Sequence, residues 1–247
     1  MNRSTVLSMV LTGLLALTSI AAEDEHTITV AGNAEKKVKP DIAYVTLYAQ
    51  ADGILMVDAV KKADKLIDEI TTAINTQTNT VKDISIVDVA VGEKKQQYWG
   101  PDQKQEAPRP QVARRIRIAC EPVPEGIYEV IDQAIRAGAL MQIPSSTSYS
   151  DDIRSVVVYG LEKSKEVVDR VKRSAMEDAR VEAKELAGLT GKKVGDVVTI
   201  GCAGPSHFRY PVRIMGRRAD FPTEHVGTNP GEVTISHIVS VTFELKD

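Results

Sequence analysis

The sequence predicts an α+β fold, in which a mostly antiparallel sheet carries two long helices and one short helix. Alternating, β-branched segments occur near both ends of the chain and in its middle, and two long segments have apolar residues at steps of three and four. Strand and helix patterns follow one another in a meander-like order, without a repeat of fixed period. We therefore expect one domain over 23–247, with an outer part from 27–80 plus 194–247 and an inner part from 81–193.

A long amphipathic helix is predicted in the first half of the chain, and polar residues at 75–79 end it. Six apolar residues share one stripe of this helix, while charged residues fill its other side. Alternating side chains predict strands before and after the helix, and Lys39-Pro40-Asp41 separates the first two strands. The helix stripe consists of Met56, Val60, Ala63, Ile67, Ile70 and Ile74, and the strands cover 27–36, 41–50, 83–93 and 111–121.

The middle of the chain predicts a short helix followed by two strands. The helix covers 125–137, and Gly138 is its expected stop because glycine readily adopts the left-handed conformation that closes helices. Residues 140–161 predict two strands around 150–152, which would form an extra hairpin.

A second long helix is predicted over 165–187, with Ser164 as its N-cap and Gly188 as its stop. Its stripe is rich in alanine, which predicts close approach to a sheet or to a partner helix. Strands over 194–202 and 232–245 complete the fold. The stripe consists of Val168, Val171, Ala175, Ala179, Ala183 and Leu186.

The N-terminus has the features of a signal peptide. Arg3 precedes an apolar run over 6–20, and Ser19-Ile20-Ala21 places small residues at the −3 and −1 positions of a cleavage site. The run is shorter than the ~20 apolar residues of a membrane span, although a retained anchor is the alternative. We expect a signal peptide over 1–22, cleavage near Ala21 or Ala22, a periplasmic mature chain and no transmembrane segment in it.

Composition argues against several classes of protein. The net charge of −3 gives no long-range attraction to nucleic acid, so we expect no nucleic-acid partner. Aromatic residues make up 4% of the chain, which argues against a surface that stacks bases or sugars. Cys120 and Cys202 are too few for a disulfide framework. We expect two buried free thiols, and pairing of the two cysteines is the alternative.

The sequence contains none of the familiar catalytic or nucleotide-binding motifs, and its four histidines are not spaced to form a metal pair on one element. We expect no catalytic residue, no cofactor and no metal.

Four residues are candidates for contact with a ligand or partner. His237 points with the apolar face of the last strand, either as a core or subunit-contact histidine or as a ligand or pH-sensitive switch. Arg209 and Arg213 belong to a basic loop over 207–218, which is either solvated or binds an anionic envelope surface or acidic partner. Trp99 either anchors a partner or covers the core.

Four blocks, in the right order, resemble the SIMPL domain. Its opening is similar to Ile28-Thr29-Val30-Ala31-Gly32 followed by Val38-Lys39-Pro40-Asp41-Ile42-Ala43. The other blocks are Ala137-Gly138-Ala139; Asp178-Ala179-Arg180 with Ala183, Leu186-Ala187, Gly191, Gly195 and Val197; and Pro230-Gly231-Glu232-Val233 leading to Val241-Thr242-Phe243-Glu244-Leu245. The blocks contain turns, a helix stripe and strands, and none is a catalytic motif.

The resemblance implies an exported, non-enzymatic protein of the type that includes bacterial periplasmic immunogenic and oxidative-stress defence proteins. We therefore expect an envelope protein that forms a homo-oligomer or binds an envelope partner, with a link to stress defence. One alternative is a periplasmic enzyme or small-ligand binder with its site near His237 and the 207–218 loop. Another is a protein-docking adaptor, because eukaryotic members of the family are kinase-associated signalling proteins.

Overall fold

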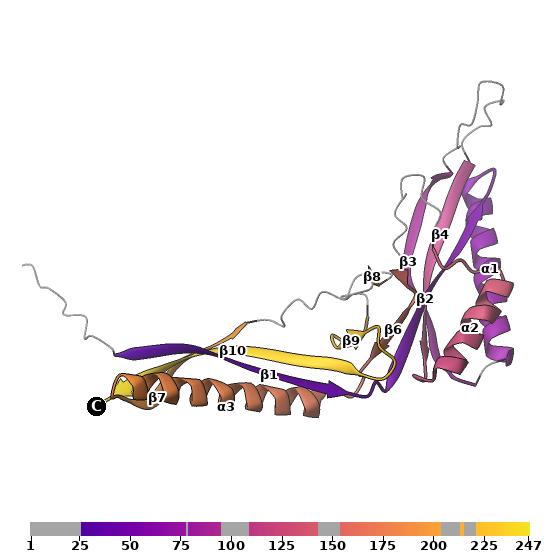
Figure 1. Cartoon of the computed structure of the whole chain (residues 1–247). Coiled ribbons are helices and arrows are strands. Elements are labelled where there is room, and N and C mark those ends of the chain that lie inside the picture. Colours follow the sequence, from indigo (N-terminus) through magenta and orange to yellow (C-terminus); the bar gives the residue numbers. More distant parts are fainter. Residues whose placement is uncertain (1–25, 78, 95–108, 143–153, 204–212, 215–220) are drawn as a thin grey trace, which may run out of the picture.

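The computed structural model of the chain describes residues 26–77, 79–94, 109–142, 154–203, 213–214 and 221–247. In these residues it contains three helices and two larger sheets whose strands pair antiparallel, which confirms the predicted α+β fold. Figure 1 shows that the two sheets form the two arms of an L-shaped molecule.

The first arm is a three-stranded sheet in the order β1-β10-β7, and helix α3 lies along it (Figure 1). The first and last strands of the described chain pair over their whole length, from Thr27 with Glu244 to Val38 with Val233. The elements are β1 (Thr27–Val38), α3 (Lys165–Leu189), β7 (Lys193–Ala203) and β10 (Val233–Lys246).

The second arm is a five-stranded sheet in the order β3-β4-β2-β6-β9, with α1 and α2 on one face (Figure 1). A separate parallel pair joins β5 to β8. The elements are β2 (Ile42–Asp52), α1 (Met56–Gln77), β3 (Val81–Lys94), β4 (Arg109–Cys120), α2 (Pro124–Arg136), β5 (Arg154–Ser155), β6 (Val157–Gly160), β8 (Arg213–Ile214) and β9 (Val226–Gly227).

The predicted hairpin over 140–161 lies partly outside the described residues. Within them, Leu140 forms an isolated bridge with Tyr48, and β6 pairs with β2 and β9.

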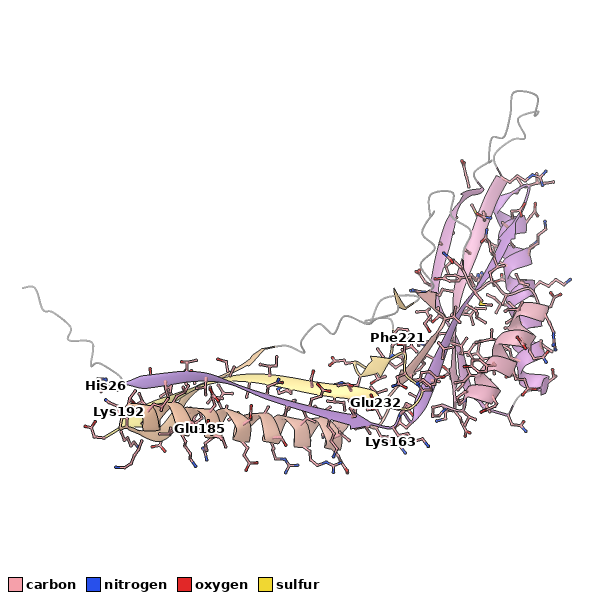
Figure 2. The ribbon with its side chains drawn as sticks, viewed as in Figure 1. His26, Lys163, Glu185, Lys192, Phe221 and Glu232 are labelled. Atoms are coloured by element: carbon pink, nitrogen blue, oxygen red, sulfur yellow. The ribbon has the colours of Figure 1, made fainter. Side chains whose placement is uncertain are left out.

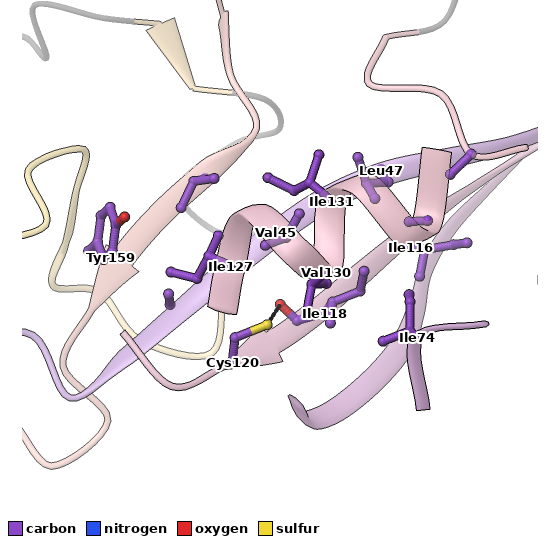
Figure 3. Packing of buried hydrophobic residues seen from close by; sticks show 14 of the residues in the cluster. Val45, Leu47, Ile74, Ile116, Ile118, Cys120, Ile127, Val130, Ile131 and Tyr159 are labelled. Atoms are coloured by element: carbon purple, nitrogen blue, oxygen red, sulfur yellow. Dashed lines mark hydrogen bonds between the residues drawn. The ribbon is translucent and has the colours of Figure 1, made fainter. Parts of the chain in front are cut away.

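One buried cluster extends from the second arm into the first. Figure 3 shows Ile127 and Val130 of α2 packed over Val45 of β2 and Ile118 of β4. The same cluster includes Ile235 of β10, together with Val233 on that strand and Val171 on α3. A continuous apolar core therefore joins the two arms.

The alanine stripe of α3 packs closely on the sheet, as predicted. Ala175, Ala179 and Ala183 are fully buried against strands β1 and β10. Ala175 and Ala179 lie over Gly32 of β1, where an added Cβ would be 2.6 Å from the backbone nitrogen of Ala179. The stripe continues to Ala187, because steps of four residues keep to one line of the helix. Leu186 was predicted in this stripe and is exposed.

The helix ends confirm one predicted stop and correct another. Gly138 follows α2 with a φ of 99°, as expected of a helix-closing glycine. Gly188 was predicted to end the long helix, but α3 continues to Leu189, and the left-handed glycine is Gly191 with a φ of 71°. Ser164 occupies the N-cap position, and its side chain makes no capping hydrogen bond.

Asp41 connects two chain segments at the point where the arms meet. Its Oδ1 accepts a hydrogen bond from the backbone N–H of Glu162 at 2.7 Å, and its Oδ2 accepts one from that of Lys163 at 3.1 Å. The backbone N–H of Asp41 also donates to the carbonyl of Gly160. Figure 2 shows Lys163 at this junction, just before α3 begins. One carboxylate thus ties the β1–β2 connection to the β6–α3 connection.

Candidate functional site

The structure places two of the four predicted contact residues. Trp99 and Arg209 lie outside the described residues. Arg213 lies in β8 opposite Arg154 of β5, whereas His237 lies on β10 opposite Ala34 of β1. His237 and Arg213 therefore belong to different sheets.

His237 lies on the face of β10 that packs against α3, as its position in the strand predicted. It is partly buried, and its Nε2 has no hydrogen-bond partner in the structure. Burial lowers the pKa of His237 below its ordinary value of 6.5, and the positive charge of Lys172 on α3 lowers this pKa further. The neutral imidazole is therefore favoured. Among the described residues, no group of three or more His, Cys, Asp or Glu could hold a metal ion.

Cys120 is a buried free thiol, as predicted for this residue, and its Sγ lies 4.0 Å from the carbonyl oxygen of Ile118 (Figure 3). Burial raises the pKa of Cys120 to about 12, so the thiolate that would act as a nucleophile is suppressed. The residue belongs to the core of the second arm.

The face of the second sheet away from the helices is partly enclosed. The side chain of Arg115 is only 15% exposed and pairs with Asp88 of β3 at 3.5 Å. The guanidinium of Arg117 lies 5.9 Å from the ring centroid of Tyr44 and donates a hydrogen bond to Ser85. These arginines hold β3, β4 and β2 together.

A shallow groove lies between β1 and α3. Its volume is about 310 Å³, and its lining contains both positively and negatively charged side chains. This mixed lining gives no single charge for a ligand to match. The lining residues are Ala34, Glu35, Lys36, Arg170, Val171, Arg173, Ser174 and Glu177.

The β1 edge beside this groove is protected against pairing with another strand. The backbone N–H of Asn33 donates to the Asp178 carboxylate on α3 at 2.8 Å. Lys37 pairs with Glu232 at 2.8 Å. Charged side chains and an occupied backbone donor discourage edge-to-edge pairing.

Strand β3, at the edge of the five-stranded sheet, differs from β1 because it carries exposed apolar side chains. Ile86, Val89 and Val91 are 46%, 51% and 60% exposed. Helix α1 packs mainly on β2 and β4 and makes few contacts with β3. Val91 lies opposite Val112, which is buried under α1, and the exposed row therefore begins where the helix cover stops.

The start of α1 adds exposed apolar side chains at the same end of the sheet. Ile54, Leu55 and Val57 are 82%, 64% and 60% exposed. Gly53 donates its N–H to the carbonyl of Pro110, which pairs with the end of β3. We call the six residues Ile54, Leu55, Val57, Ile86, Val89 and Val91 the open flank. Figure 1 shows that α1 begins, and β3 ends, at the end of the second arm that points away from the other arm.

Sequence reasoning missed the open flank as a site. The alternation of β3 was recognised, but alternation does not reveal which strand lies at an edge. The run Ile54–Val57 was a usable signal, because four consecutive apolar residues at a helix start exceed what one buried stripe needs.

No helix in the described part of the chain has the length and apolar character needed to cross a membrane. The SIMPL family model, described as a protein of unknown function (DUF541), matches residues 28–243. No curated protein matches the chain.

Proposed function

Because the chain belongs to the SIMPL family, we propose that it is an exported, non-enzymatic envelope protein that acts by assembling with copies of itself. The observation that carries this proposal is the open flank. Large exposed apolar patches on soluble proteins mark interaction surfaces. An uncovered sheet edge also presents unpaired backbone groups that another strand can use.

We propose that the protein has no enzyme site because of where the groups with shifted pKa values lie. Catalytic sites gather groups with shifted pKa values in one cleft. Here Cys120 is in the core of the second arm, and His237 is under α3 in the first. Tyr44 and Tyr159, whose pKa values are raised by burial, lie on strands of the second sheet. Cys120 and Tyr159 share one buried core cluster and Tyr44 lies in another, and none of the four groups lines the groove between β1 and α3.

Export and a periplasmic location are proposed on the N-terminal sequence. N-terminal sequencing of the protein from an envelope fraction should begin at Ala22 or Glu23. A chain that retains Met1 in the cytosol would contradict this part of the proposal. The link to envelope stress defence rests on the family resemblance alone.

Assembly is tested by the mass of the mature chain in solution. Size-exclusion chromatography with light scattering should give a multiple of the monomer mass across a range of concentrations. A well-folded monomer at high concentration would overturn the proposal and favour a monomeric binding protein. A thermal-shift screen then separates that alternative from an inert protein, because a saturating ligand stabilises the folded state.

A further inference from the structure

We propose that β3 of one copy pairs antiparallel with β3 of a second copy, so that the five-stranded sheets of the two copies become one continuous sheet. This inference rests on the proposed function and names the contact that the assembly uses. It gives a register in which Ile86 faces Val89 of the partner strand and Ile84 faces Val91.

The choice of strand follows from the condition of the edges. The N–H of Asn33 is already occupied and charged residues flank it, so β1 is a poor template. Strand β7 exposes two large apolar side chains, Val198 and Ile200, fewer than the three of β3. Its other end is charged, where Asp196 binds Lys246 of β10 at 3.1 Å. Strand β9 has only two residues, whereas β3 has 14. A long edge that is apolar on one face is therefore found at β3.

Ile84, Ile86, Val89 and Val91 of β3 lie on one face of the sheet, because the register with β4 shifts by one residue between Ile86 and Asp88. The pairing with β4 sets Ile84 opposite Ile118, Ile86 opposite Ile116, and Val91 opposite Val112. Those three residues of β4 are buried beneath the helices. A second β3 in the proposed register extends this helix-bearing face, and each aliphatic side chain gains an aliphatic neighbour across the new seam.

Charge favours this register over the neighbouring register that centres on Asp88. With Ile86 opposite Val89 of the partner, Lys82 comes opposite Glu93 of the partner strand, and two-fold symmetry makes this favourable pair twice. A shift by one residue that places Asp88 opposite its own copy also places Asp83 opposite Glu93. That register places like charges directly opposite one another, and this destabilises the pairing of the two strands. It also brings together residues that lie on opposite faces of the two sheets, because a slip by one residue reverses the faces.

Disulfide trapping tests the register directly. The double variant Ile86→Cys/Val89→Cys should form a covalent dimer on a non-reducing gel after mild oxidation, because each new thiol faces its complement in the partner. Each single variant should stay monomeric on the same gel, because neither residue lies opposite its own copy in the partner strand. The single variants also control for the native cysteines. Absence of the dimer in the double variant, or equal dimer in a single variant, would overturn the pairing.

A charge substitution tests the same contact without oxidation. Val89→Lys should raise the dissociation constant of the assembly by about tenfold or more, because two like charges would then enter one seam. The matched control is Val181→Lys on α3, since Val181 is 50% exposed and lies on the other arm. Circular dichroism verifies that both variants fold.

The outcomes separate this inference from the proposed function. A wild-type monomer contradicts assembly itself. A wild-type oligomer that Val89→Lys leaves intact, and that the double variant fails to cross-link, preserves assembly and removes β3 as its contact.

Discussion

Gly32→Ala is the sharpest test of how the first arm is built. Gly32 lies where α3 crosses β1, and its backbone is not in a left-handed conformation, so alanine brings no conformational strain of its own. The added Cβ would overlap the carbonyl oxygen of Ala175 and lie 2.6 Å from the backbone nitrogen of Ala179. Neither atom can move by changing a side-chain rotamer. Relief therefore requires α3 to shift away from the sheet.

The magnitude follows from what that shift would disturb. Overpacking a core costs about 1–3 kcal/mol when side chains can adjust. A clash with helix backbone belongs at the top of this range, and moving α3 also loosens the buried contacts of Ala175, Ala179 and Phe243. We expect Gly32→Ala to lower the free energy of unfolding by about 3 kcal/mol.

Gly92→Ala in β3 is the matched control. No atom lies within 4 Å of the position of its added Cβ, and its backbone is also not left-handed. Alanine there should be neutral or stabilise the protein by about 0.5–1 kcal/mol, because it restricts the unfolded chain. Urea unfolding followed by circular dichroism, at one fixed protein concentration, measures both variants. A Gly32→Ala variant as stable as Gly92→Ala would refute the close contact of α3 with β1.

Four further outcomes are expected. Asp41→Ala should lower the free energy of unfolding by about 1–2 kcal/mol through loss of its charge-assisted hydrogen bonds, and an unchanged urea midpoint would contradict this. Ala179→Lys should cost about 2–4 kcal/mol, whereas the exposed Lys172→Ala should cost less than about 0.5 kcal/mol. The pKa of His237 is lower in the folded than in the unfolded state, so the stability it contributes is present above pH 6.5 and is lost as the pH falls below that value. Melting temperatures between pH 5 and 7.5 should therefore fall less with acid in His237→Phe than in wild type. Cys120 should resist iodoacetamide at pH 8 in the native protein and react after denaturation, and mass spectrometry showing native labelling would contradict its burial.

Local patterns predicted the elements well because each depends on neighbours in the sequence. The periodic apolar residues located α1 and α3, and the Gly138 stop was correct because a left-handed residue closes α2. The stop of α3 was wrong because Gly188 and Gly191 are both glycines near the helix end, and only backbone conformation distinguishes them. Leu186 was misplaced because the helix stripe follows steps of four to Ala187.

Features that depend on distant parts of the chain could not be predicted in this way. The two hydrogen bonds of Asp41 reach residues 121 and 122 positions away. The exposure of Val89 depends on where α1 ends its cover of the sheet, which no pattern within β3 encodes. Half of the predicted contact residues, Trp99 and Arg209, lie outside the described residues, and His237 was placed on the correct face because strand alternation is local.

The pairing of the first strand with the last has a consequence for how the molecule comes into being. Thr29 meets Thr242 across 213 positions of sequence, so β1 leaves the ribosome long before its partner exists. Such non-local contacts close late and slow the folding of a domain. The second arm, whose strands β2, β3 and β4 are near neighbours in the sequence, is able to form first. The first arm then closes only after β10 has been synthesised, so β1 remains without its partner strand until that point.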